Sequence, residues 1–206
     1  MSRMRALRIV FDLLLLGGVT VLLVSCNGPR CVRTTVSYDD LSRPLPIMSC
    51  GSAQIHDLLL FFLETNPQAD ISEVTEIAQL YIEEAGAEGV NHDVAFCQMC
   101  IETNYLRFGG DVRRRQNNFA GIGATGNGVP GDSFDSVRMG IRAQIQHLKA
   151  YGGKKRLRRR LVDPRFRRVR RGSAPYVENL SRKWAADPEY GAKIRMKLKS
   201  LAGQSY

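Results

Sequence analysis

Apolar side chains recur every three or four residues from about residue 52 onward, which predicts a mainly α domain. A first helix before Pro67 has one apolar face, formed by Ile55, Leu58, Leu59, Phe62 and Leu63. A second helix starts at a capping box of Asp70 and Glu73 and runs to Gly86, with apolar residues at Ile71, Val74, Ile77, Ala78 and Tyr81. Later helices are expected from Ser136 to Tyr151 and after Asp187-Pro188, where Pro fits the first helical position.

A segment between these helices is apolar on almost every side, which is typical of a buried helix. Asn91 fits an N-cap, and Gly109-Gly110 is expected to end the helix. From Val94 to Gly110 the single acidic residue is Glu102. Burial raises the pKa of a carboxyl group and keeps it protonated, as the general acid of a glycosidase requires. The alternative is a partly exposed Glu at a fraying helix end.

Residues 109–135 carry seven glycines and almost no helical pattern, so a loop or a short hairpin is expected there. A long ordered loop in a compact domain is usually functional. The fold class expected from these patterns is therefore mainly α, with a small glycine-rich hairpin or loop lobe.

The N-terminus has the pattern of a bacterial export signal. Three arginines precede an apolar run that is short for a membrane span and ends in Leu23-Val24-Ser25-Cys26, a lipobox-like sequence. We expect residues 1–25 to be a lipoprotein signal peptide, Cys26 the lipidated residue, 26–51 a tether and 52–206 the functional domain. The protein would then be lipid-anchored in the cell envelope, at the outer membrane or the outer face of the cytoplasmic membrane. A transmembrane anchor is the alternative.

The net charge of the chain indicates which kinds of partner it could bind. The formal net charge is +10, and removal of residues 1–25 would leave +8. Eleven Lys or Arg lie among the eighteen residues from Lys154 to Arg171. This segment suits either docking to anionic lipid or wall polymer, or a solvated, mobile basic loop. An exported protein does not meet the chromosome, so nucleic acid is not expected as a partner.

The cysteines indicate structural roles. Cys31 and Cys50 flank the expected tether and could form a disulfide in an oxidising compartment. Cys97 and Cys100 are spaced C-x-x-C, but no second such pair exists and the histidines are scattered. Core-filling residues are therefore favoured over a metal or redox site. His147 is interpreted as a hydrogen-bonded structural residue, and neither a cofactor nor a metal ion is expected.

Three motifs occur in order along the domain. They are Gln98-Met99-Cys100-Ile101-Glu102-Thr103-Asn104, then Gln116-Asn117-Asn118-Phe119-Ala120-Gly121-Ile122-Gly123, then Trp184-Ala185-Ala186-Asp187-Pro188-Glu189-Tyr190-Gly191-Ala192-Lys193-Ile194. Together they resemble the glucosaminidase domain of peptidoglycan hydrolases, glycoside hydrolase family 73, including its Bax-like lipoprotein members. The resemblance covers roughly residues 52–201 and implies a lysozyme-like helical domain with a small glycine-rich hairpin or loop lobe. It implies hydrolysis of β-1,4 bonds between amino sugars in peptidoglycan glycan strands, with cleavage after N-acetylglucosamine.

The resemblance also assigns roles to residues. Glu102 matches the catalytic acid, and Asn118, Phe119 and Gly121 match the loop that lines the glycan groove. Trp184 matches an aromatic position on which a sugar ring could stack, with an ordinary core Trp as the alternative. Tyr190 matches the second aromatic residue of the last motif.

The second catalytic group stays open. Residues 111–147 contain only Asp111, Asp132 and Asp135 as acids. Asp132 or Asp135 could act as a base, although Asp135 also fits an N-cap. Otherwise the substrate's own acetamido oxygen attacks the anomeric carbon and Tyr190 or an Asn orients it. A lytic transglycosylase and a non-catalytic wall-binding lipoprotein are the other functions that the sequence leaves open.

Overall fold

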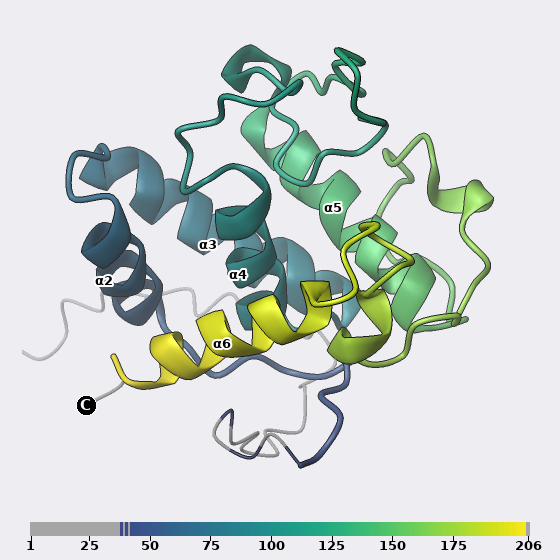
Figure 1. Ribbon diagram of the computed structural model, residues 1–206, viewed down its shortest axis with the longest axis horizontal. Coiled ribbons are helices and arrows are strands. Elements are labelled where there is room, and N and C mark those ends of the chain that lie inside the picture. Colours follow the sequence, from purple (N-terminus) through teal and green to yellow (C-terminus); the bar gives the residue numbers. More distant parts are fainter. Residues whose placement is uncertain (1–37, 39, 41, 205–206) are drawn as a thin grey trace, which may run out of the picture. The chain divides into compact units, whose positions relative to one another are not determined.

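The computed structural model describes residues 38, 40 and 42–204, and this part of the chain is mainly helical (Figure 1). Its α-helices are α2 (Ile55–Thr65), α3 (Ile71–Glu88), α4 (His92–Glu102), α5 (Val137–Gly152) and α6 (Tyr190–Ala202). Three short 3₁₀ helices are η1 (Arg114–Gln116), η2 (Phe166–Arg168) and η3 (Val177–Leu180). The predicted fold class, a mainly α, lysozyme-like domain, is confirmed. No helix in the described ranges is long and apolar enough to span a bilayer.

Helix α4 lies at the centre of the domain and contacts each of the other four α-helices (Figure 1). Its residues from Asp93 to Cys100 are all buried, as its apolar pattern predicts. Asn91 is the N-cap, because its side-chain oxygen accepts hydrogen bonds from the backbone amides of Asp93 and Val94. The central position of α4 fixes the place of every side chain that it carries, including Glu102.

The end of α4 differs from the prediction. The helix stops at Glu102, with Thr103 as C-cap, and not at Gly109-Gly110. Four residues beyond it have positive φ: Asn104 (48°), Tyr105 (53°), Leu106 (59°) and Phe108 (58°). Left-handed backbone is unfavourable for such residues, and here it accompanies burial of Tyr105 against the rings of Phe61 and Phe62. Glu102 is therefore the last helical residue.

Ion pairs of buried carboxylates join α3 to α5. Glu84 accepts hydrogen bonds from Arg138 and Arg142, at 2.8–3.0 Å. Further along the same pair of helices, the buried Lys149 ammonium lies 2.6 Å from the Glu88 carboxylate. These contacts hold the two helices in one register.

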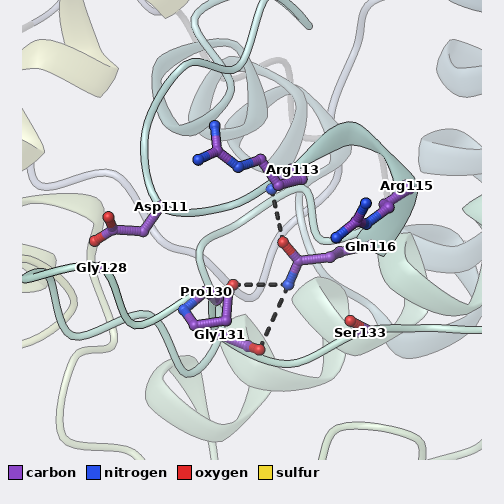
Figure 2. A pocket seen from close by; sticks show the side chains of 8 residues that line it. All are labelled: Asp111, Arg113, Arg115, Gln116, Gly128, Pro130, Gly131 and Ser133. Atoms are coloured by element: carbon purple, nitrogen blue, oxygen red, sulfur yellow. Dashed lines mark hydrogen bonds between the residues drawn. The ribbon is translucent and has the colours of Figure 1, made fainter.

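Residues 109–136 form the expected loop lobe, which contains η1 and an isolated bridge between Gly126 and Val129. Gln116 organises it, since its side chain accepts from the Arg113 amide and donates to the Pro130 carbonyl, both at 2.7 Å (Figure 2). The lobe approaches α5 most closely at Gly140, where a Cβ would lie 1.7 Å from the Asn117 carbonyl oxygen. A glycine is required at that contact.

The segment predicted as a tether is partly core. Tyr38, Leu45 and Ile47 are at most 4% exposed and belong to the main hydrophobic cluster. The Tyr38 hydroxyl donates to Asp93 at 2.6 Å, and the Ser52 amide donates to the same carboxylate at 2.7 Å. The domain therefore extends N-terminally beyond residue 52. Cys50 is disulfide-bonded; Cys31, the signal peptide and the lipidation residue Cys26 lie outside the described residues.

Residues 154–171, called the basic strap below, are not an unanchored loop. The backbone amides of Arg158 and Arg159 donate to Glu88, at 2.8–3.1 Å. The Gln146 side chain donates to the Arg160 carbonyl and accepts from the Val162 amide. Buried side chains of α3 and α5 thus fix the strap's backbone while most of its basic side chains stay exposed.

Candidate active site

Three segments meet at Glu102. The Tyr190 hydroxyl, at the first residue of α6, donates a hydrogen bond to Oε1 of the Glu102 carboxyl group. The side chain of Trp184 lies near the same carboxyl group and acts to lower its pKa. From the loop lobe, Gly121 lies so close that a Cβ there would be 3.3 Å from Oε2. The three sequence motifs therefore converge on one carboxyl group.

The surroundings of Glu102 favour its protonated form. Burial raises the pKa of Glu102 above its ordinary value, and the hydrogen bond from Tyr190 and then the nearby Trp184 side chain only partly oppose this. Glu102 also ends α4, where the helix dipole presents negative charge and disfavours a carboxylate. The residue as a whole is half-buried. A protonated carboxyl group with partial access to solvent is what a general acid needs.

Gly121 is fixed by its neighbours in the loop motif. Its φ is +61°, a conformation that glycine adopts without strain. The buried Asn118 side chain donates to the carbonyl oxygens of Ile122 and Asp132, at 2.8 and 2.9 Å, and accepts from the Ile122 amide at 3.0 Å. These hydrogen bonds of Asn118 hold the turn that places Gly121 beside Glu102.

Two loop residues that the resemblance assigns to the glycan groove have buried side chains. Asn118 is 1% exposed, and its polar atoms are engaged in that turn. Phe119 is 4% exposed and packs in the core beside Gly140. Both shape the loop from inside because their side chains point into the protein, and Gly121 alone of the three lies beside the candidate acid.

Trp184 lies against the aromatic rings of α5. Its ring is perpendicular to that of His147, with centroids 5.0 Å apart, and 5.8 Å from the ring of Tyr151. The His147 Nδ1 is 2.8 Å from the Asp163 carboxylate, which supports its interpretation as a hydrogen-bonded structural residue. These contacts orient Trp184, whose half-exposed ring remains available at the site.

The two candidate second carboxylates make their contacts elsewhere. Asp132 pairs with the Arg165 guanidinium of the basic strap at 2.8 Å. Asp135 is exposed, and the N-cap of α5 is Ser136, whose hydroxyl accepts from the Met139 amide. Among the described contacts of Glu102, neither aspartate appears.

A hollow of about 320 Å³ opens in the loop lobe, separate from Glu102 (Figure 2). Its lining includes Asp111, Arg113 and Arg115 around the Gln116 side chain. No ion pair joins Asp111 to either arginine among the described residues, and both arginines are exposed.

The C-x-x-C pair lies in the core as expected. Cys97 and Cys100 are fully buried free thiols, and burial raises the pKa of both. Their sulfur atoms fill space between α4 and its neighbours. Within the described ranges, no three His, Cys, Asp or Glu side chains cluster as metal ligands would.

Sequence reasoning assigned no role at the site to three polar residues that lie behind it. Gln98 donates to the Tyr190 oxygen at 3.1 Å, Gln144 donates to Gln98 at 2.9 Å, and the Tyr81 hydroxyl donates to Gln144. Gln98 precedes Glu102 by one helical turn, so its position in an apolar helix was the available signal. Tyr81 and Gln144 gave no such signal, since their partners are distant in sequence.

Comparisons with known proteins agree with the convergence of the motifs. The model of the glucosaminidase family, described as mannosyl-glycoprotein endo-beta-N-acetylglucosaminidase, matches residues 78–202. A protein of Borreliella burgdorferi described as uncharacterized is 46% identical over 155 residues, covering 75% of this chain and 76% of that protein. No solved structure matches significantly. The matched region contains α4, the loop lobe, the basic strap and α6, and this chain therefore belongs to the glucosaminidase family.

Proposed function

We propose that this protein is an endo-β-N-acetylglucosaminidase that hydrolyses β-1,4 bonds in peptidoglycan glycan strands, with Glu102 as general acid. The observation that carries the proposal is the Glu102 carboxyl group. Burial and the end of α4 favour its protonated form, while Tyr190, Trp184 and Gly121 surround it. The family supplies the glycan as substrate class.

The mechanism follows from the groups that contact Glu102. Its proton passes to the glycosidic oxygen, the C1–O bond breaks, and the electron pair leaves with that oxygen. Because Asp132 is engaged by Arg165 and Asp135 is exposed beside α5, the substrate's acetamido oxygen is the favoured nucleophile, bonding to C1. Water then opens this ring at C1 and returns a proton to the Glu102 carboxylate. Asp132 as a base is the alternative.

Product analysis tests the reaction type. Purified peptidoglycan is digested with the full-length protein, and the released ends are identified by mass spectrometry. Reducing N-acetylglucosamine ends are expected. Anhydro-muramoyl ends would identify a lytic transglycosylase, which also uses a single helical Glu. Binding of glycan without release of any ends would favour a non-catalytic wall-binding lipoprotein.

We further propose that the protein is exported and anchored to the envelope by lipid on Cys26. The support is the lipobox-like sequence, which lies outside the described residues. Cys26→Ser is expected to abolish labelling by radioactive fatty acid and release the protein from the membrane fraction. Continued labelling of the variant would contradict this anchor.

The basic strap supports a further contact with anionic phospholipid at the membrane surface. Of its eleven basic residues, Arg165 alone forms an ion pair with a carboxylate in the described structure. The Cys26→Ser protein is expected to co-sediment with vesicles containing acidic lipid and less so after Arg167→Gln and Arg168→Gln. Matched changes at the exposed Arg43 and Arg182 test whether net charge alone explains the loss. Binding to isolated wall polymer but not to vesicles would assign the strap to the wall.

A further inference from the structure

A continuous chain of hydrogen bonds runs through the core to Glu102. It starts at Tyr81 on α3, passes to Gln144 on α5, then to Gln98 on α4 and then to Tyr190 on α6. Tyr190 donates to Glu102 at the end of α4. The first three residues are fully buried and Tyr190 is 4% exposed, so water does not compete for these bonds.

The direction of every bond in the chain follows from one backbone atom. The Gln144 Nε2 lies 3.0 Å from the Ala95 carbonyl oxygen, which can only accept. The amide nitrogen of Gln144 is therefore on the side of Ala95 and Gln98, and its oxygen must accept from Tyr81. Gln98 then presents its oxygen to Gln144 and its nitrogen to Tyr190.

Tyr190 is left with one possible role. Its oxygen accepts from Gln98 Nε2 at 3.1 Å, so its own proton points to Glu102 Oε1. Burial, and next the Glu102 charge, raise the pKa of Tyr190 well above 10.0, so the hydroxyl keeps that proton. An oxygen that already accepts from a fixed donor is poorly placed to carry the acid proton.

We propose that Tyr81, Gln144 and Gln98 are positioning residues that act through Tyr190 and assign the acid proton of Glu102 to Oε2. This inference rests on the proposed role of Glu102 as general acid. Oε2 is the oxygen beside Gly121, where a Cβ would approach to 3.3 Å, so the absence of a side chain keeps the protonated oxygen accessible from the loop side.

The arrangement serves the proton transfer. As the O–H bond at Oε2 breaks and a new one forms on the glycosidic oxygen, negative charge develops on the carboxyl group. The Tyr190 hydroxyl is already directed at Oε1, so this charge meets a donor that needs no reorientation. Gln98 and Gln144 prevent the hydroxyl from rotating away.

The test compares two buried glutamines on α5. Gln144→Met breaks the chain, whereas Gln146→Met removes an equally buried amide that bonds the basic strap instead. The titration of the Glu102 carboxyl carbon is followed by ¹³C NMR in the full-length protein, with Glu102→Gln identifying its signal. Gln144→Met is expected to raise the pKa of Glu102 relative to Gln146→Met, because Tyr190 loses its fixed direction. Gln98→Met, one bond nearer, should raise it further.

Kinetics on soluble glycan provide the second readout. The chain-breaking variants are expected to lower kcat about tenfold and leave KM nearly unchanged, because the chain does not contact substrate. An unchanged Glu102 titration in folded Gln98→Met and Gln144→Met would overturn the proposal. If neither variant folds, Tyr190→Phe provides the same titration with one hydroxyl removed, and an unchanged pKa there would also overturn it. The NMR titration of Glu102 can be measured even in a protein without catalytic activity. A failure of the hydrogen-bond proposal can therefore be distinguished from a failure of the proposed function.

Discussion

At the scale of single residues, the site is built around one carboxyl group held where its charge is disfavoured. Glu102 sits at the negative end of α4, and burial raises its pKa. An acid whose folded-state pKa is raised loses stabilisation as pH rises through that pKa, since the ionised form is tolerated better in the unfolded chain. The feature that suits catalysis should therefore weaken the fold above the ordinary pKa of Glu.

Glu102→Gln should consequently melt at a higher temperature than the wild type at neutral pH, because a neutral amide does not ionise. The difference in Tm should grow as pH rises above 4.5, the ordinary value, and vanish below it. Calorimetry at a series of pH values measures it. A Tm difference that does not change with pH would show that ionisation of Glu102 does not destabilise the fold.

The burial of a single residue could be predicted from the sequence where the residues next to it form a clear pattern. Glu102 is the single acidic residue in the apolar stretch from Val94 to Gly110, which was enough to predict a buried carboxyl group. Asn118 and Phe119 carry a motif, but a motif does not say which way a side chain points. Gln144 could not be assigned, because its partner Gln98 lies 46 residues away in sequence.

At the scale of elements, the loop lobe is positioned by its contact with α5. The Asn117 carbonyl lies against Gly140, so the lobe that delivers Gly121 to the site depends on a helix without a side chain at that point. Gly86 on α3 is also helical, but it is exposed and a Cβ there would meet nothing within 4 Å. The two glycines form a matched pair.

Gly140→Ala is expected to destabilise the protein by about 3 kcal/mol, because its Cβ would overlap the Asn117 carbonyl and displace the lobe. Gly86→Ala should stabilise it by about 1 kcal/mol through helix propensity alone. Urea unfolding of both variants measures the two effects. Equal shifts of the same sign would refute the close contact between lobe and helix.

Element starts were more predictable than element ends. Asn91 caps α4 as predicted, because capping is a local interaction. Ser136 caps α5 in place of Asp135, and α6 begins at Tyr190 and not at Pro188, so these two starts were predicted closely but not correctly. The end of α4 was wrong by several residues, since Tyr105 and Leu106 adopt left-handed backbone while packing into the core. This backbone conformation depends on tertiary contacts, which cannot be inferred from the sequence pattern.

At the scale of the whole molecule, the N-terminal segment is joined to the core through Asp93. Its carboxylate receives hydrogen bonds from Tyr38, Ser52 and Ala53. Burial opposes the charge, but His92, Tyr38 and Ser52 together hold the pKa of Asp93 below its ordinary 3.8. The sequence indicated a tether here, because the segment contains Pro44 and Pro46 and shows no helical periodicity.

Asp93→Asn is expected to destabilise the protein by about 2 to 4 kcal/mol at neutral pH, because buried donors lose a charged acceptor. A lowered folded-state pKa gives stability that is present above 3.8 and lost as pH falls through the folded value. The variant should therefore approach the wild type as pH drops below about 4. Denaturant unfolding at neutral and acidic pH measures this, and a constant difference would contradict the account.

The central claim is that Glu102 protonates the leaving oxygen, and leaving-group dependence tests it most directly. Wild type and Glu102→Gln are compared on a glycan chain, whose sugar alcohol needs a proton to leave, and on the same oligosaccharide linked to nitrophenol, which leaves without one. We predict a rate loss on the glycan that exceeds the loss on the nitrophenyl glycoside by about a hundredfold or more. Equal losses on the two substrates would contradict the assignment of Glu102 as general acid.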